Sequence, residues 1–213
     1  MVAHTKEEPR TLAEALASDD AADWRQAWDS EVKSLKGNGT WVLENLPEGR
    51  TVIGCRWVFK IKEDGRYKAR HVAKGYAQAP GIDFNEIFAL VAKFTTLRTL
   101  LALAAENDWE LQGMDVKTAF LHSELAESIY MEIPAGLRPE GEYSPRLVCR
   151  LVKTIYGLKQ ALRAWYGKIT TFFSEQGFCR SEEDYSLFVH DSAVSSYCYM
   201  LMTLSLQRQQ KKE

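Results

Sequence analysis

One carboxylate stands out because it is set in a run of apolar residues. Asp115 has as its apolar neighbours Trp109, Leu111, Met114, Val116, Ala119 and Phe120. A charge in a largely buried strand needs a partner or a metal ion, so Asp115, at or near the end of such a strand, is a candidate metal ligand. The alternative is a helix cap, with Thr118 and Ala119 in the first turn of the following helix. The residues alone leave both interpretations open.

A second candidate is the basic segment formed by residues 51–74. Residues 51–62 alternate between apolar and polar side chains, Asp64-Gly65 is typical of a tight turn, and residues 66–74 alternate again. This pattern predicts a β-hairpin. It carries seven Lys or Arg residues against two acids. The hairpin is therefore either a phosphate-facing surface or an ordinary solvated ribbon whose lysines discourage edge pairing. His71 is as easily a half-buried sheet residue as a ligand.

The totals describe a globular chain and exclude several classes. Its 213 residues carry a net charge of −2, so no global basic field indicates a nucleic-acid partner. The four cysteines form no C-x-x-C pair, which favours a reduced, intracellular protein. No apolar run is long enough for a membrane span, and no signal-peptide core is present, so neither membrane insertion nor export is expected. The sequence contains no nucleophile–base motif, glycine-rich phosphate loop or zinc-type spacing.

The elements expected around these candidates alternate between helix and strand, which predicts an α+β fold. Residues 1–18 are polar and expected to be loose. Asp19 or Asp20 can cap a helix whose apolar stripe comprises Trp24, Trp28, Val32 and Leu35. The other expected elements are a helix capped by Thr95 or Thr96, the Asp115 strand, a helix at 119–125, strands at 129–133, 147–153 and 186–190, and a helix from about 161 to 176.

Five motifs, in this order, resemble one family closely. The chain resembles the reverse transcriptase region of copia-type LTR retrotransposon Pol polyproteins from about Trp24 to His190. The motifs are Trp57-Val58-Phe59-Lys60, Arg66 to Tyr76, Gly81-Ile82-Asp83-Phe84, Met114 to Leu121, and Ile155 to Ala161.

This resemblance implies the fingers and a partial palm of a right-hand polymerase, truncated before the complete palm and thumb. Residues 19–105 would be the fingers-like region with the basic hairpin at 51–74, and residues 106–190 the partial palm. The family is a group of nucleotidyltransferases whose implied partners are an RNA or DNA template-primer and deoxynucleoside triphosphates. The implied location is intracellular, in a cytoplasmic particle or the nucleus. The resemblance gives no oligomeric state.

The resemblance also implies roles for particular residues. Asp115 matches the family's first metal-binding aspartate, with the backbone carbonyl of Val116 as an additional ligand, in a site for two Mg²⁺ ions. Phe120 lies where the family places a bulky side chain against the 2′ position of the sugar. Lys68 and Arg70 are the expected triphosphate contacts. The loop that packs on the incoming nucleotide and template is matched by Gly157, Lys159 and Gln160.

One family motif is missing. The family needs a Tyr-Val-Asp-Asp hairpin after the strand at 186–190, and its two aspartates complete the metal site. Residues 195–206 contain no carboxylate. Since one carboxylate cannot hold two divalent ions, the chain is expected to be catalytically inactive as written. The alternative function is that of a non-catalytic nucleic-acid-binding remnant, and a third possibility is an unstable product without function.

The genetic code offers a reason for the missing motif. If each codon's last base is joined to the first two of the next, Met202 followed by Thr203 must give GAC, which encodes aspartate. Residues 199–202 can then encode Tyr-Val-Asp-Asp in the shifted frame. We therefore expect a frameshift between about His190 and Ser196, either in the DNA or in the gene prediction, with residues 191–213 as out-of-frame translation. Further departures from the family pattern are Leu90 and Leu162 for proline, Ser123 for glycine and His71 for leucine.

Overall fold

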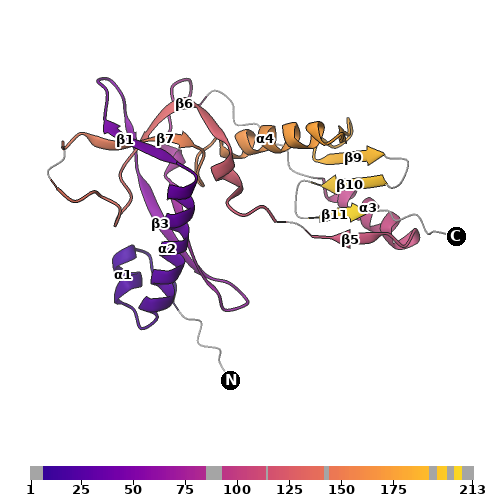
Figure 1. Cartoon of the computed structure of the whole chain (residues 1–213), viewed down its shortest axis with the longest axis horizontal. Helices are drawn as coiled ribbons and strands as arrows, with labels where there is room; N and C mark the ends of the chain where they lie inside the picture. Colours follow the sequence, from indigo (N-terminus) through magenta and orange to yellow (C-terminus); the bar gives the residue numbers. More distant parts are fainter. Residues whose placement is uncertain are drawn as a thin grey trace. The chain divides into compact units, whose positions relative to one another are not determined.

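The computed structural model describes residues 7–84, 93–113, 115–141, 144–191, 196–200 and 204–207. Helices and sheets are mixed, so the fold is α+β, and the chain divides into two compact units (Figure 1). Unit 1 comprises the described residues of 1–87 and 118–164, and unit 2 those of 88–117 and 165–213. Within the described residues, no helix is both long and apolar enough to cross a membrane. The departure at Leu90 lies outside the described residues.

Unit 1 begins with a short helix where the sequence predicts a loose segment. Helix α1 (Leu12–Ala17) is preceded by Thr11, whose Oγ1 accepts a hydrogen bond from the backbone N–H of Glu14 at 3.1 Å. The Glu14 carboxylate accepts one from the backbone N–H of Arg10 at 2.8 Å. These contacts satisfy N–H groups at the start of the helix, and Ala15 is fully buried. Packing of this turn onto unit 1 thus orders part of the polar segment.

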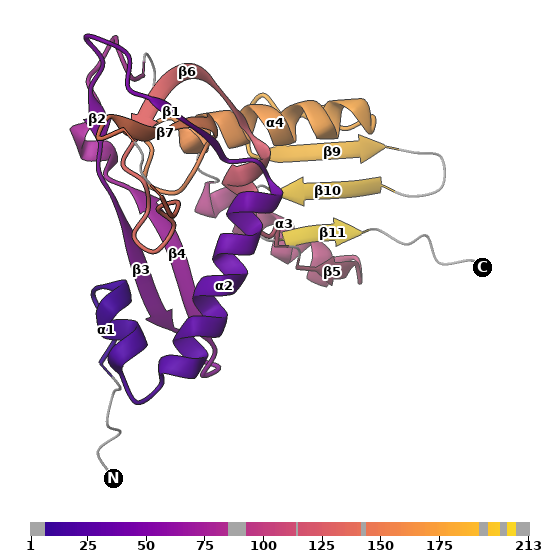
Figure 2. The ribbon, with the colours of Figure 1, turned by 60° about the vertical axis from the view of Figure 1, so that its left-hand side comes forward.

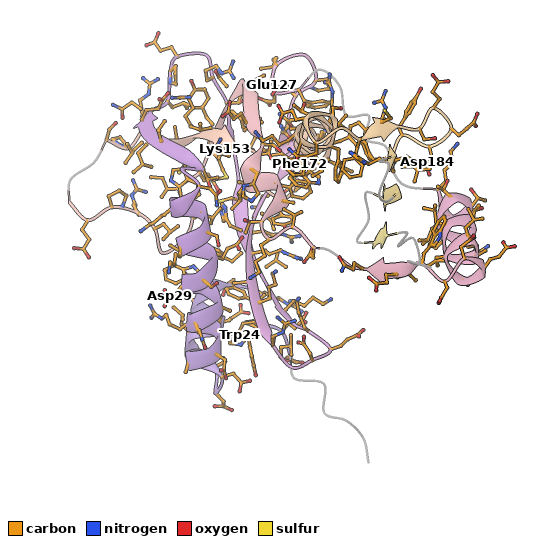
Figure 3. The ribbon with its side chains drawn as sticks, turned by 45° about the vertical axis from the view of Figure 1, so that its right-hand side comes forward. Trp24, Asp29, Glu127, Lys153, Phe172 and Asp184 are labelled. Atoms are coloured by element: carbon orange, nitrogen blue, oxygen red, sulfur yellow. The ribbon has the colours of Figure 1, made fainter. Side chains whose placement is uncertain are left out.

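Helix α2 (Ala21–Gly37) confirms the predicted apolar stripe. Trp24, Trp28, Val32 and Leu35 are all buried. The helix lies along the hairpin of strands β3 (Cys55–Ile61) and β4 (Tyr67–Ala73) in both ribbon views (Figures 1 and 2). Trp24 contacts the rings of Phe59 and Tyr67 edge to face, with centroids 5.4 and 4.5 Å apart. Figure 3 shows Trp24 on the side of α2 facing the hairpin and Asp29 on the other side.

The β3–β4 hairpin is the one predicted at residues 51–74. Its strands pair antiparallel, with Trp57 opposite His71 and Phe59 opposite Ala69. At the turn, the backbone N–H of Lys62 donates to the carbonyl oxygen of Arg66 at 2.9 Å. One face carries the buried side chains that pack under α2, and the opposite face carries the basic residues, because successive side chains of a strand point to opposite sides.

The remaining strands of unit 1 form a four-stranded sheet in the order β1-β7-β6-β2. These strands are β1 (Trp41–Asn45), β7 (Leu147–Lys153), β6 (Glu124–Met131) and β2 (Val52–Ile53). Short 3₁₀ turns, η1 (Gly75–Ala77) and η2 (Ala119–His122), flank the hairpin and the sheet in the sequence. The helix predicted at 119–125 is therefore only the turn η2, since the chain is already paired with β7 from Glu124 onward.

Unit 2 contains a five-stranded antiparallel sheet in the order β5-β11-β10-β9-β8. Its strands are β5 (Glu110–Gln112), β8 (Cys179–Arg180), β9 (Leu187–Asp191), β10 (Ser196–Met200) and β11 (Leu204–Gln207). Its helices are α3 (Phe94–Glu106) and most of α4 (Ala161–Glu175). Helix α4 lies beside β9 (Figure 2), with the rings of Phe173 and Phe188 4.9 Å apart. The sequence predicts no strand after residue 190, whereas β10 and β11 follow β9.

Helix α3 begins at Phe94 and is capped from outside its own sequence. The predicted caps were Thr95 or Thr96, but the N-cap position is Lys93, which provides no side-chain cap. The carboxylate of Asp184 accepts a hydrogen bond from the backbone N–H of Lys93 at 3.0 Å. Although its burial by itself raises the pKa of Asp184, hydrogen bonds from the Thr96 side chain and from the N–H groups of Ser186 and Lys93 lower the pKa below its usual value. The charged carboxylate therefore stabilises the start of α3.

Candidate functional site

The basic face of the hairpin is built by the register of β3 and β4. Lys60 lies opposite Lys68, and Val58 lies opposite Arg70. Arg70 and Lys60 are exposed, whereas Lys68 is half-buried. The two predicted triphosphate contacts, Lys68 and Arg70, thus lie on the same face of the same strand, two residues apart. This face can receive an anionic ligand because its basic side chains lie together, while the buried side chains of the hairpin are on the opposite face.

Arg70 belongs to a three-residue cluster that joins distant parts of the sequence. Its Cζ lies 4.9 Å from the ring centroid of Tyr156, which is a cation–π contact. The ring of Phe120, from η2, meets that of Tyr156 edge to face, with centroids 4.9 Å apart and planes at 82°. Tyr156 and Phe120 are half-buried. The structure therefore brings the predicted triphosphate contact Arg70 and the predicted sugar-facing residue Phe120 into contact with the ring of one tyrosine.

The loop that carries Tyr156 lies directly on the edge of β4. The backbone N–H of Ala73 donates to the carbonyl oxygen of Tyr156 at 2.8 Å. Gly157 has a φ of +89°, and a Cβ at this position would collide with the carbonyl oxygen of Ala73. A Cβ at Gly75 would in turn collide with the carbonyl oxygen of Gly157. Glycine is required at both positions because two backbone segments approach each other without space for a side chain.

The next residues of this loop are held by Gln78, whose side chain is 3% exposed. The Gln78 Nε2 donates to Oε1 of Gln160 at 3.0 Å, and its Oε1 accepts from the backbone N–H of Lys159 at 2.8 Å. Gln160 is 4% exposed and its Nε2 donates to the carbonyl oxygen of Asp83 at 2.9 Å. The Lys159 ammonium lies 4.4 Å from the ring centroid of Phe84. The predicted contacts Lys159 and Gln160 are thus bound to residues 78–84.

Two titratable groups are buried between α2 and β4. The Glu31 carboxylate accepts a hydrogen bond from the backbone N–H of His71 at 3.2 Å. Burial raises the pKa of Glu31, an effect opposed by that hydrogen bond and by the charges of Lys68 and Arg70. Burial lowers the pKa of His71 to about 4. His71 is therefore a neutral core residue, and among the described residues neither of its ring nitrogens has a hydrogen-bond partner.

Asp115 does not lie where the sequence predicts. Strand β5 ends at Gln112, all three of its residues are exposed, and Asp115 and Val116 are exposed as well. The apolar neighbours of Asp115 therefore do not enclose it, and the premise of a carboxylate at the end of a largely buried strand is wrong. The helix-cap interpretation also finds no support, because the N-cap of η2 is Thr118. Asp115 and Val116 belong to unit 2, whereas the predicted nucleotide and template contacts belong to unit 1.

Among the described residues, the available donors do not fit a two-ion site. Across the described ranges, no three His, Cys, Asp or Glu side chains are grouped so that they could hold a metal ion. Asp115 would be one carboxylate ligand, and residues 195–206 supply no second one. Two hard divalent cations require several oxygen ligands, so this donor set cannot hold the pair.

Two residues of the site had no role in the sequence analysis. Tyr156 was part of a recognised motif, and the aromatic residue beside Gly157 was the available signal. Gln78 gave no signal, because its contacts to Lys159 and Gln160 span 81 and 82 residues and a lone glutamine after a turn is unremarkable. Both were found only from tertiary contacts.

Comparison with known proteins gives a consistent family. Residues 38–203 match the family described as reverse transcriptase (RNA-dependent DNA polymerase). The chain is 43% identical over 200 residues to the retrovirus-related Pol polyprotein from transposon TNT 1-94 of Nicotiana tabacum, covering 92% of this chain and 15% of the relative. It is 44% identical over 201 residues to that from transposon RE2 of Arabidopsis thaliana, covering 92% and 13%. The transposon Ty1-NL2 Gag-Pol polyprotein of Saccharomyces cerevisiae is 31% identical over 163 residues, covering 74% and 9%.

Proposed function

Since the chain belongs to the reverse transcriptase (RNA-dependent DNA polymerase) family, as the copia-type region of a retrotransposon Pol polyprotein, we propose that it retains a nucleotide-binding surface but lacks catalytic activity. The chain spans less than one sixth of the curated relatives it matches, at 15% and 13% of their lengths. Residues 19–105 are proposed as fingers and residues 106–190 as a partial palm. The intracellular location expected from the family is part of this proposal.

The proposed nucleotide contacts are Lys68, Arg70 and Phe120. Support comes from unit 1, where Arg70 and Phe120 contact the same tyrosine ring and Lys68 shares the face of Arg70. A guanidinium and an ammonium on one strand face suit the oxygens of a triphosphate. Gln160 is proposed as a further nucleotide contact. Its side-chain amide must first break its hydrogen bonds to the Gln78 side chain and the Asp83 carbonyl oxygen. Gly157 and Lys159 are proposed to present this loop to the template and primer.

The proposed inactivity rests on the metal ligands. The family generally uses Mg²⁺, and Asp115 with the carbonyl of Val116 is proposed as the remaining part of its site. The observation that carries the proposal is that the family match runs to residue 203, while residues 196–207 contain no Asp or Glu. Strands β10 and β11 pair antiparallel in this segment, with Met200 opposite Leu204. We propose that the Tyr-Val-Asp-Asp sequence was lost from this hairpin through the frameshift.

Primer extension by the purified chain tests the inactivity. A primed RNA or DNA template with Mg²⁺ and all four deoxynucleoside triphosphates should show no extension. The frame-restored variant M200V/L201D/M202D, in which Tyr199 is kept, is the matched comparison, and any activity it gains should disappear when Asp115→Asn is added. Extension by the unaltered chain would refute the proposal. The genomic DNA provides an independent check, because absence of the motif from the neighbouring frame would exclude the frameshift.

A second candidate function is binding of template or primer without catalysis. The observation that favours it is the exposed basic face of the hairpin, which includes Arg56, Lys60 and Arg70. Contacts with phosphates release counterions, so such binding weakens steeply with salt. Binding that does not depend on salt would argue against this function.

A further inference from the structure

We propose that Tyr156 is the residue that positions Arg70 and Phe120, so that the triphosphate contact and the sugar-facing side chain form one coupled unit. This inference rests on the proposed function, because it concerns the same nucleotide site. Tyr156 itself is assigned no role by the sequence motifs. It is proposed to act through its two neighbours and not by taking part in any chemical step.

The first argument is the placement of the ring. The Arg70 guanidinium lies over Tyr156 at 4.9 Å, and Phe120 meets the same ring at 4.9 Å and 82°. An arginine on an exposed strand face otherwise samples many rotamers, and a ring beneath the guanidinium restricts it while its N–H groups stay available for phosphate oxygens. A T-shaped aromatic pair likewise fixes the direction of the Phe120 ring.

The second argument is that the backbone on both sides of Tyr156 is fixed. The carbonyl oxygen of Tyr156 accepts a hydrogen bond from the N–H of Ala73 at 2.8 Å, and Tyr156 forms a parallel bridge with Val72. The carbonyl oxygen of Phe120 accepts a hydrogen bond from the Thr154 hydroxyl. Strand β4, which carries Arg70, and turn η2, which carries Phe120, are therefore each tied to the segment 154–156. A ring on such a rigid segment can hold two mobile side chains in register.

The third argument concerns the competing residue of the same loop. Both ends of the Gln160 amide are already bonded, to Gln78 and to the carbonyl oxygen of Asp83, and the side chain is 4% exposed. Gln160 therefore anchors the loop in this structure. Tyr156 is half-buried and meets the two proposed nucleotide contacts directly. In this loop, therefore, Gln160 holds the backbone in place, and Tyr156 contacts the proposed nucleotide-binding side chains.

The test is a titration of the full chain with dGTP in metal-free buffer, with binding measured by saturation-transfer NMR. Tyr156→Leu is expected to raise the dissociation constant about fivefold, the effect of losing one cation–π contact, whereas Tyr156→Phe keeps the ring and restores the affinity. Since Tyr156 acts through Arg70, the double variant with Arg70→Gln should bind no more weakly than Arg70→Gln alone. Tyr185→Leu is the matched control, because Arg180 lies 4.5 Å from that ring centroid in unit 2.

A second readout separates positioning from simple loss of structure. The ratio of dGTP to GTP affinity should fall in Tyr156→Leu, because Phe120 loses its support, while a merely destabilised chain would lose both affinities together. If Arg70→Gln weakens binding but Tyr156→Leu does not, or if the two effects add, the positioning role is refuted and the nucleotide site stands. If the unaltered chain does not bind dGTP, or if Arg70→Gln has no effect, the proposed nucleotide site fails and this inference fails with it.

Discussion

Replacement of His71 by leucine should stabilise the chain, and the gain should grow as the pH falls. His71 is 1% exposed and packs near two tryptophans, with its ring centroid 5.0 Å from that of Trp57 and 6.2 Å from that of Trp41. Neither imidazole nitrogen has a hydrogen-bond partner among the described residues. Leucine fills similar space without polar atoms, so His71→Leu removes the cost of burying unsatisfied nitrogens, about 1–3 kcal/mol at neutral pH.

The pH dependence has a defined sign and size. Burial lowers the pKa of His71 to about 4 from its ordinary value of 6.5 in the unfolded chain. Between these values the unfolded chain binds the proton more tightly, so stability is full above about pH 6.5 and is lost as the pH falls towards 4. At 1.36 kcal/mol for each pKa unit, this loss is about 3 kcal/mol. The advantage of His71→Leu should increase by that amount between pH 7 and pH 4.

Urea unfolding followed by tryptophan fluorescence at several pH values measures this difference. Glu31 also titrates here, since its carboxylate bonds the backbone N–H of His71 and Lys68 and Arg70 act on its charge. Glu31 is present in both proteins, so the difference between their curves isolates the imidazole. His122→Leu is the control, because the His122 side chain is exposed. Parallel stability curves for the unaltered chain and His71→Leu would refute the reasoning.

Three further predictions concern the glycine contact, the cap of α3 and the basic face. Gly157→Ala should destabilise unit 1 by about 2–4 kcal/mol in urea unfolding, because the new Cβ meets the carbonyl oxygen of Ala73. Gly65→Ala, at φ +79° with no atom within 4 Å, should cost only about 1 kcal/mol, and equal costs would contradict the steric argument. Asp184→Asn should cost about 1 kcal/mol. The lowered pKa of Asp184 means that its stabilisation is present at neutral pH and is lost as the pH falls below its usual range. The protection factors of the amides in the first turn of α3, which correct for the intrinsic exchange rate, should therefore fall in acid only in the unaltered chain. In Lys68→Gln and Arg70→Gln, single-stranded nucleic acid should bind more weakly, each with a salt slope lower by about 1, and an unchanged slope would exclude these phosphate contacts.

Most of the helices and strands could be predicted from local sequence patterns. The apolar stripe of α2 and the alternation of the hairpin were predicted because each depends on residues within one element. The predicted apolar side chains of α2 are buried, and the hairpin pairs as expected. The turn η2 was mistaken for a longer helix, because pairing of β6 with β7 takes over at Glu124. That pairing joins residues separated by a long loop, and nothing near residue 124 signals it.

The contacts within the candidate site could not be predicted from the sequence, and the roles of its residues stay predictions. The family motifs assign roles to Arg70 and Phe120, but they do not predict that both side chains contact Tyr156, because that ring comes from a third segment. The exposure of Asp115 was missed because the sequence pattern around it is misleading. Its apolar neighbours predict burial, but burial requires a partner layer, and β5 presents all three of its residues to solvent.

The contrast between the two groups of functional residues decides what the chain should do. In unit 1 the loop at 155–160 is fixed by close glycine contacts and by the Gln78 side chain. All the residues that the proposed binding surface requires are therefore present in the sequence. Catalysis needs a set of carboxylates that residues 195–206 do not provide. Binding and turnover should therefore separate: dGTP binding should persist in the unaltered chain and in Asp115→Asn alike, with primer extension absent from both. A loss of dGTP binding in Asp115→Asn would show that the nucleotide site depends on the remaining metal ligand, contrary to this division.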